Sequence, residues 1–269
     1  MTNPKFTVVI PTYNRAPFIE KAIESVRKQS FQHWKILIID DASTDDTVEI
    51  IQPYLEDSRI RLITLPENKG ISHVMNLALD EIDTPYFVQL DSDDWLSKHA
   101  LRCFHLMSSK DPQAALLYGN IRMWRQDQNG EWKVIRSIRH RSFYNKYQFL
   151  VYMTYMLHPR CYRTEAVLDV GGWETADPYD GRVMEDRRMV VKLIEKYRIR
   201  WINQFLYHRR KHGKQLTGPE HYAARNKLRR SLVLDSLEKW GNRYKPVFGY
   251  RKGFLIVKRL IPLRTKIGR

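Results

Sequence analysis

The stretch Tyr86-Phe-Val-Gln-Leu-Asp91-Ser-Asp93-Asp94-Trp95-Leu96 joins an apolar run to three carboxylates within four residues. α/β proteins place metals and ligands at the carboxyl ends of parallel strands, so a buried strand that ends in acids predicts such a site. Residues two apart in an extended segment point the same way, and Asp91 and Asp93 are therefore expected to face one hard cation. The alternative, that Asp93 or Asp94 caps a helix starting near Trp95, accounts for only one carboxylate.

Strands and helices alternate through the first hundred residues. Runs of β-branched residues predict strands, and apolar residues at helical spacing predict the helices between them. Repeats of this length with short connections predict right-handed βαβ units and a parallel sheet. The predicted strands are Phe6–Ile10, Lys35–Ile39, Ile60–Leu65 and Tyr86–Leu90, and the predicted helices are Ala16–Gln29, Ser43–Leu55 and Ile71–Glu81.

The pattern loosens after about residue 115. Asn129-Gly130, between Trp124 and Trp132, predicts a β-hairpin. We expect one domain over residues 1–217 and a basic, aromatic, helical extension over residues 218–269. The further predicted elements are strand Ala114–Tyr118, hairpin Arg122–Ile138, helices Thr164–Val170 and Glu185–Tyr197, strand Ile199–Tyr207 and helix His221–Trp240.

The 269 residues carry a formal net charge of +16, which predicts an anionic partner such as nucleic acid, a phospholipid surface or a phosphorylated substrate. Residues 243–269 hold nine Lys or Arg and no Asp or Glu. The two cysteines, Cys103 and Cys161, have no metal-ligand spacing and predict a reducing cytosol. No run reaches the ~18 apolar residues of a membrane span, and no signal peptide is expected before the first strand.

Three predicted strand ends carry polar groups that could converge on one crevice. They are Pro11-Thr-Tyr-Asn-Arg15, Asp40-Asp41-Ala-Ser43 and Asp91-Ser-Asp93-Asp94. No G-x-G-x-x-G fingerprint or phosphate-binding P-loop accompanies them, so a nucleotide would be held by carboxylates, with Mg²⁺ or Mn²⁺ on its phosphates. Asp40 and Asp41 alone fit a helix N-terminus equally well.

Further motifs follow along the chain: Asn68-Lys-Gly70, Asn76, Gly171-Gly172-Trp173-Glu174, Glu185-Asp186 and the His208–His212 segment. In order and spacing, the whole set resembles the motifs of family 2 glycosyltransferases. The similarity extends over about residues 5–217. It implies a GT-A fold, a Rossmann-like and mostly parallel central sheet flanked by helices, with a nucleotide-binding half over residues 1–115 and an acceptor half over residues 116–217. It also implies inverting transfer by single displacement.

The resemblance assigns roles to individual positions. Asp186 matches the general base, Asp93 the more direct metal ligand, and Asp91 a residue near the ribose and the metal. His212 matches a position that reaches the metal or the diphosphate in some members. The implied nucleotide-binding residues are Pro11, Thr12, Tyr13, Arg15, Asp41, Ser43, Lys69, Gly70, Asp91 and Ser92, and the implied acceptor-side residues are Trp173, Glu174 and Glu185.

Some of these positions have alternatives or depart from the family. Glu185-Asp186 could simply cap the following helix, and His212 could belong to a solvated basic face. Met75 replaces the usual arginine before Asn76, so that a diphosphate or base contact is either missing or supplied by His73 or Lys69. Trp173 stands where a smaller aromatic residue is usual.

The predicted function is metal-assisted transfer of a sugar from a nucleotide sugar, UDP-linked, to an acceptor hydroxyl in polysaccharide synthesis. The acceptor would be a glycan, a lipid-linked molecule or a cell-wall polymer. The alternative is a non-catalytic module of the same fold that binds anionic polymer or membrane. The basic aromatic segment 243–269 fits an anionic membrane surface, or a helix packed on the domain, in a cytoplasmic or inner-face peripheral protein. Nucleic acid is not expected, because no recognition motif accompanies the charge.

Overall fold

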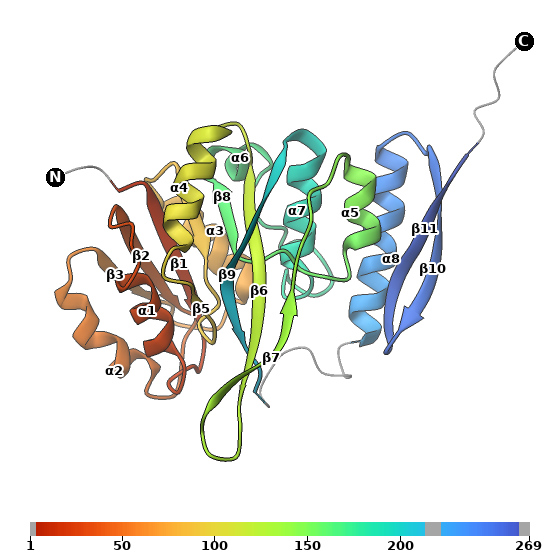
Figure 1. Cartoon of the computed structure of the whole chain (residues 1–269). Coiled ribbons are helices and arrows are strands. Elements are labelled where there is room, and N and C mark those ends of the chain that lie inside the picture. The colour runs from red at the N-terminus through yellow and green to blue at the C-terminus, as the bar shows by residue number, and fades with distance from the viewer. Residues whose placement is uncertain (1–3, 213–221, 264–269) are drawn as a thin grey trace, which may run out of the picture.

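The computed structural model describes residues 4–212 and 222–263. Its elements form one curled sheet with helices on both faces and a separate two-stranded ribbon (Figure 1). The strands are β1 (Phe6–Thr12), β2 (Trp34–Asp40), β3 (Ile60–Thr64), β4 (Tyr86–Gln89), β5 (Trp95–Leu96), β6 (Leu116–Gln126), β7 (Trp132–Ile138), β8 (Arg160–Arg163), β9 (Ile199–Arg210), β10 (Tyr244–Arg251) and β11 (Phe254–Pro262). The helices are α1 (Ile19–Arg27), α2 (Thr47–Ile51), the 3₁₀ helix η1 (Gln52–Glu56), α3 (Ile71–Glu81), α4 (Ala100–Lys110), α5 (Lys146–Tyr152), α6 (Thr164–Asp169), α7 (Glu185–Lys196) and α8 (Tyr222–Lys239).

The first four strands form the predicted parallel sheet in the order β3-β2-β1-β4. In register, Thr12 lies opposite Asp40, and Val9 lies opposite Gln89. The carboxyl ends of β1, β2 and β4 therefore meet at one edge of the sheet, where the three predicted polar segments begin.

The second half of the sheet is mixed. β8 runs antiparallel between β4 and β6, whereas β9 runs parallel to β6 and reaches β5. The predicted hairpin at 122–138 is confirmed by the antiparallel pair β6–β7. Its turn closes through the Gly130 amide, which donates to the Asp127 carbonyl at 3.1 Å.

The alternative of a helix that starts near Trp95 is wrong. Trp95 and Leu96 form the short strand β5, paired antiparallel with His208 and Tyr207, and α4 begins only at Ala100. Asp94 does not cap a helix, because its Oδ1 accepts a hydrogen bond from the Arg210 amide at 2.7 Å. That bond ties the chain after the acidic turn to the end of β9.

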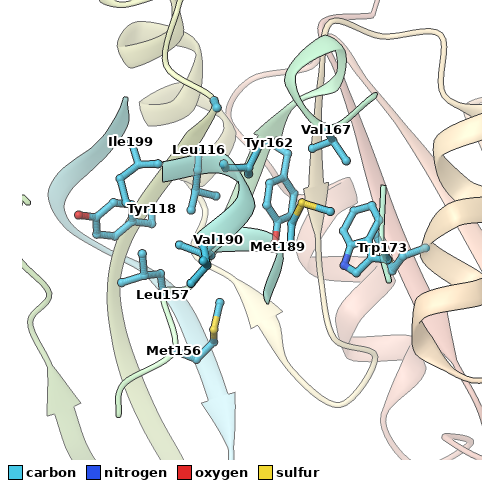
Figure 2. Packing of buried hydrophobic residues seen from close by; sticks show 14 of the residues in the cluster. Leu116, Tyr118, Met156, Leu157, Tyr162, Val167, Trp173, Met189, Val190 and Ile199 are labelled. Carbon is cyan, nitrogen blue, oxygen red and sulfur yellow. The ribbon is translucent and has the colours of Figure 1, made fainter. Parts of the chain in front are cut away.

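Alternate residues of the central strands supply two cores. Val8 and Ile10 pack in a cluster with residues of α1 and α4, while Val9 faces a cluster that includes residues of α3, α5 and α7. This burial on both faces explains the continuous β-branched runs. Figure 2 shows the second cluster, in which Tyr162 of β8, Met189 of α7 and Trp173 lie close together.

The C-terminal extension is helical only in part. Helix α8 confirms the predicted basic helix, but Tyr244–Pro262 forms the antiparallel hairpin β10–β11 instead of continuing as helix. Lys252 and Gly253 connect the strands with φ of 51° and 81°, the conformation of a two-residue hairpin turn. The predicted boundary at 217/218, the helix start at His221 and the tail residues 264–269 lie outside the described residues.

The extension packs on the domain. Val233 and Leu237 of α8 belong to the same buried cluster as α7, and the Tyr147 hydroxyl donates to the Trp240 carbonyl at 3.1 Å. The Tyr147 and Tyr244 rings lie 4.6 Å apart. Among the described residues, no helix combines the length and apolar composition that a membrane span requires.

Candidate functional site

Asp91, just after β4, lies in an ion pair. Its Oδ1 accepts from Arg160 Nη2 at 2.7 Å, and its Oδ2 lies 3.6 Å from His158 Nε2. Burial alone would raise the pKa of Asp91, but Arg160 and His158 hold that pKa well below its usual range. The Asp91 carboxyl is therefore ionised at neutral pH and remains 36% exposed.

Asp93 contacts a residue that is distant in sequence, His212. Its Oδ2 lies 2.8 Å from Nε2 of His212, and the His212 ring lies 4.6 Å from the ring of Phe18. The Asp93 carbonyl accepts from Arg210 Nε at 2.9 Å. The structure thus places Asp93 and His212 side by side, as a shared ligand role requires, and that role stays a prediction.

The buried carboxyl of Asp94 fixes the acidic turn, residues 91–94. Asp94 is 2% exposed, and its burial, with Asp93 and Asp91 nearby, raises its pKa well above the usual value. The guanidinium carbon of Arg210 lies 4.6 Å from the ring centre of Phe18 and 4.8 Å from that of Trp132. This packing fixes the backbone that presents Asp93.

Asp41 organises the turn between β3 and α3. Its Oδ1 accepts from the Lys69 amide at 2.7 Å, and its Oδ2 accepts from the Gly70 amide at 2.9 Å. Gly70 has φ of 86°, and a Cβ there would lie 2.8 Å from Cζ of Arg182. Each carboxylate oxygen can accept a second hydrogen bond, so Asp41 keeps capacity for a ligand N–H.

The segment after β1 is fixed to the segment after β2. The Asp41 amide donates to the Thr12 carbonyl at 2.8 Å, and the Asn14 amide donates to Ser43 Oγ at 2.8 Å. The Tyr13 ring is 42% exposed at this edge. Of the remaining predicted nucleotide-binding residues, Pro11 lies in β1 opposite Ile39, Arg15 donates to the Tyr13 and Asn14 carbonyls, and Ser92 is buried.

The Thr12 hydroxyl has no hydrogen-bond partner within the described part of the chain, although it is buried. A buried hydroxyl without a partner is unfavourable, and a bound polar ligand would relieve it. This observation supports the prediction that the β1 end lines a ligand site.

Asp186, in the first turn of α7, is bonded to two arginines. Its Oδ1 accepts from the Arg187 amide at 2.7 Å and lies 3.2 Å from Arg187 Nη1, while its Oδ2 lies 3.5 Å from Arg160 Nη1. Burial would raise the pKa of Asp186, but Arg187 and Arg160 lower it overall. Arg160 thus joins Asp91 and Asp186, 95 residues apart in sequence, into one charged unit.

Glu185 behaves differently from its neighbour. Burial and the adjacent Asp186 carboxylate raise the pKa of Glu185 to about 8. Met184, just before it, has the left-handed φ of 59°, a strained conformation for a non-glycine residue. Two neighbouring carboxyls with pKa values pushed apart are a recurrent arrangement in acid–base sites.

The predicted acceptor-side residues Trp173 and Glu174 lie in different environments. Trp173 is 3% exposed and packs against Tyr162, so its ring belongs to the core (Figure 2). Its amide donates to Asn76 Oδ1 at 2.7 Å and its carbonyl accepts from Asn76 Nδ2 at 2.9 Å, which fixes this loop on α3. Glu174 is exposed and remains accessible to a ligand.

The two residues expected to compensate for Met75 are engaged elsewhere. His73 Nε2 lies 2.8 Å from Oδ1 of Asp180, and Lys69 pairs with Glu67. Both pairs are exposed, so a ligand phosphate could compete for either cation at little cost.

Sequence reasoning missed a set of arginines around the two carboxylates. Arg160 is 2% exposed in a short strand with no recognisable motif. Arg229 is also buried and donates to the Leu255 carbonyl at 2.6 Å; burial, with Arg187 nearby, lowers its pKa to about 10. Arg225 lies one turn earlier on α8, on the same face as Arg229. Burial and the nearby Arg187 lower the pKa of Arg225, and Asp186 and Glu185 offset only part of that effect.

The described residues contain no group of three or more His, Cys, Asp or Glu side chains gathered to hold a metal. Mg²⁺ and Mn²⁺ nevertheless need only one or two carboxylates when phosphates and water complete the shell. Asp93, with its oxygen beside His212 Nε2, offers such a donor set. The residues therefore fit a cation that arrives with a phosphorylated ligand.

Relatives with sequence similarity match only part of this chain. A teichoic acid poly(glycerol phosphate) polymerase of Staphylococcus epidermidis is 37% identical over 99 residues, 36% of this chain and 14% of that protein. A putative teichuronic acid biosynthesis glycosyltransferase, TuaG of Bacillus subtilis, is 42% identical over 104 residues, 38% of this chain. The match spans 41% of TuaG, so both relatives are matched over less than half of their length.

The fold has a counterpart among solved structures. The crystal structure of S. aureus TarS in complex with UDP-GlcNAc superposes with a TM-score of 0.65 over 86% of this chain and 67% of that chain, at 21% identity. This similarity confirms the predicted glycosyltransferase fold. The model of glycosyl transferase family 2 matches residues 7–171, from β1 through the loop before Trp173, and this chain belongs to that family.

Proposed function

We propose that the chain is an inverting glycosyltransferase that moves a sugar from a UDP-linked donor to a hydroxyl of an anionic cell-wall or cell-surface polymer. The observation that carries the proposal is the unit Asp91–Arg160–Asp186, which couples the end of β4 to the start of α7. The donor and polymer classes are supported by the names of its relatives and by the UDP-GlcNAc bound to TarS.

The nucleotide would lie along the ends of β1 and β2, against Tyr13 and Asp41. Asp41 can accept a base N–H with its remaining lone pairs, and the Thr12 hydroxyl can bond to the ligand. Mn²⁺ or Mg²⁺, held by Asp93 with Asp91 or His212 beside it, would neutralise the charge of the departing diphosphate.

Asp186 would accept the proton of the acceptor hydroxyl as its oxygen attacks the anomeric carbon and the carbon–diphosphate bond breaks. Arg160 and Arg187 keep the Asp186 carboxylate ionised and hold its orientation. Glu185, with a pKa of about 8, carries a proton at pH 7 and can donate a hydrogen bond to a sugar hydroxyl. A positioned base contributes typically about 10²–10⁴-fold to the rate.

The test combines calorimetry with a turnover assay. UDP binding is expected to require Mn²⁺ or Mg²⁺ and to be lost in Asp93→Asn. Asp186→Asn is expected to keep UDP binding and to lose turnover by about 10²–10⁴-fold. Asp80→Asn, an exposed change on α3, is the control and leaves both unchanged. Full turnover in Asp186→Asn would refute its role as base and favour a non-catalytic binding module.

We also propose that the chain works on the cytoplasmic face of the membrane as a peripheral protein. Lys245, Arg251 and Arg259 are exposed along the β10–β11 hairpin. Each basic residue near an anionic lipid surface contributes about 1 kcal/mol of attraction. Sedimentation with phosphatidylglycerol vesicles tests this surface, and a lack of co-sedimentation at low salt would contradict it.

A further inference from the structure

A cavity of about 470 Å³ lies between the end of α5 and the β10–β11 hairpin. Its size is typical of small-ligand sites, which measure about 300–1,000 Å³. Tyr152, Tyr155 and Ile256 supply apolar wall, and three cations line the remainder, Arg141, Arg251 and Lys258. No Asp or Glu among the described residues lines it, so the cavity selects for negative charge.

Contacts within the protein hold the aromatic wall and Arg141 in place. The Tyr152 and Tyr155 rings lie 5.5 Å apart, and the guanidinium carbon of Arg141 lies 5.2 Å from the Tyr152 ring centre. The Tyr152 hydroxyl lies 2.8 Å from His140 Nδ1, which fixes the ring. A guanidinium held on an aromatic face is preorganised to bind a phosphate oxygen pair.

Arg187 connects the cavity wall to the candidate base, Asp186. Tyr152 and Thr154 line the cavity, and the carbonyl of Met153 between them accepts from Arg187 Nε at 3.0 Å. Nη1 of the same Arg187 lies 3.2 Å from Oδ1 of Asp186. One side chain, Arg187, thus contacts both the cavity wall and the candidate base.

We propose that this cavity binds a phosphodiester unit of the acceptor polymer, a polyol phosphate, while a neighbouring hydroxyl is presented to Asp186. The proposal rests on the proposed function and names its acceptor class. Three cations without a carboxylate fit a repeating phosphodiester, and the tyrosine rings can pack on the polyol carbons between phosphates. The link through Arg187 favours an acceptor over a lipid headgroup, which needs no connection to the base.

The test compares two charge-reversed pairs on the same hairpin. Arg251→Glu with Lys258→Glu alters the cavity, whereas Lys245→Glu with Arg259→Glu changes net charge equally on exposed residues outside it. The probe is a synthetic glycerol phosphate oligomer, measured by fluorescence anisotropy at fixed salt, and UDP binding is measured in parallel. Arg251→Gln with Lys258→Gln provides a milder variant, and thermal melts verify folding.

The cavity pair is expected to bind the oligomer at least about tenfold more weakly, because two charge-assisted contacts become repulsive. UDP binding stays unchanged, and the control pair stays within about threefold of wild type. Equal loss in both pairs would overturn the proposal in favour of net charge. Loss of binding to phosphatidylglycerol vesicles, with oligomer binding intact, would overturn it in favour of a lipid headgroup.

The two proposals fail separately. If the wild-type protein binds UDP but not the oligomer, the acceptor cavity is refuted and the donor site stands. If it binds the oligomer through the cavity residues but no nucleotide with any divalent cation, the glycosyltransferase proposal is refuted.

Discussion

Replacing Arg160 by methionine tests whether one buried cation holds the two halves of the site together. Arg160 is 2% exposed, and its guanidinium reaches Asp91 at 2.7 Å and Asp186 at 3.5 Å. Methionine matches much of the apolar stem but leaves both carboxylates without this partner. The free energy of unfolding should therefore fall, although little volume is lost.

The magnitude follows from burial. Removing one partner of a buried ion pair costs about 3–5 kcal/mol, because an uncompensated charge remains in the interior. The Asp91 side chain is 36% exposed and can recover hydration, so the lower end, about 3 kcal/mol, is expected. Arg187 continues to compensate Asp186, which also argues against a larger loss.

The loss should depend on pH in one direction. The pKa of Asp186 is below its ordinary value of 3.8, so Arg160 stabilises the fold above that value, and the stabilisation is lost as pH falls through the lowered pKa. In Arg160→Met both carboxyls take up protons at higher pH than in wild type. The stability difference between the two proteins should therefore be largest near pH 7 and narrow below pH ~4.

Urea denaturation at pH 7 and at acidic pH measures both effects. Arg61→Met is the matched control, because Arg61 lies 2.6 Å from Glu81 in an exposed pair that is expected to contribute about 0–1 kcal/mol. A loss below about 1 kcal/mol for Arg160→Met at pH 7, equal to the control, would refute the argument that Arg160 is a buried bridge.

Two further predictions concern Glu185 and Asp41. Glu185 has a raised pKa of about 8 against an ordinary 4.5, so the native state holds a proton that the unfolded chain releases, and wild-type stability should fall as pH rises through this window. In Glu185→Gln this fall should be absent. Above pH 8 the free energy of unfolding of the variant should exceed that of wild type by on the order of 2 kcal/mol, and near pH 5 the two values should be equal. A difference that stays constant at all pH values would contradict this prediction. Asp41→Asn should lose about 1–3 kcal/mol of stability and weaken UDP binding, because an NH2 donor replaces one of the two oxygens that accept from the Lys69 and Gly70 amides. Unchanged calorimetric affinity and melting temperature would count against the role given to Asp41.

The parallel half of the fold was predictable because its evidence is local. Residues such as Val8 and Ile38 are β-branched members of runs buried on both faces, and short polar turns separate them from amphipathic helices. Period and turn chemistry within about 30 residues suffice to identify a βαβ unit. The positions of Asp41 and Asp93 at the strand ends followed from the same pattern.

The hairpin β10–β11 shows where that reasoning failed. A segment rich in Tyr, Phe, Ile and Val favours strand, and Lys252-Gly253 supplies the two left-handed residues that a tight turn requires. The basic charge of the segment drew the interpretation toward an amphipathic helix. The basic composition of this segment suggested an anionic partner, but its structure follows from strand propensity and from the Lys252-Gly253 turn.

The strand at Trp95 was missed for a different reason, because it exists only through partners that are distant in sequence. Asp94 Oδ1 bonds to the Arg210 amide, and Trp95 lies opposite His208. These contacts join positions more than a hundred residues apart, and nothing near Trp95 in sequence announces them. The role of Arg160 was not predictable for the same reason, because its partners Asp91 and Asp186 are distant in sequence and come together only in the fold.

These long-range contacts define what the acidic motif does. Asp91 is fixed by the buried Arg160 and His158, and Asp94 by the Arg210 amide. Asp93 instead directs its carboxylate toward His212, a side chain of a metal-ligand type. Three adjacent carboxylates would repel one another if all were ionised and equally exposed. The structure avoids this by pairing the first with a cation and burying the third with a raised pKa. The middle carboxylate, Asp93, is thereby the one suited to meet an incoming cation, which is why its substitution should affect nucleotide binding first.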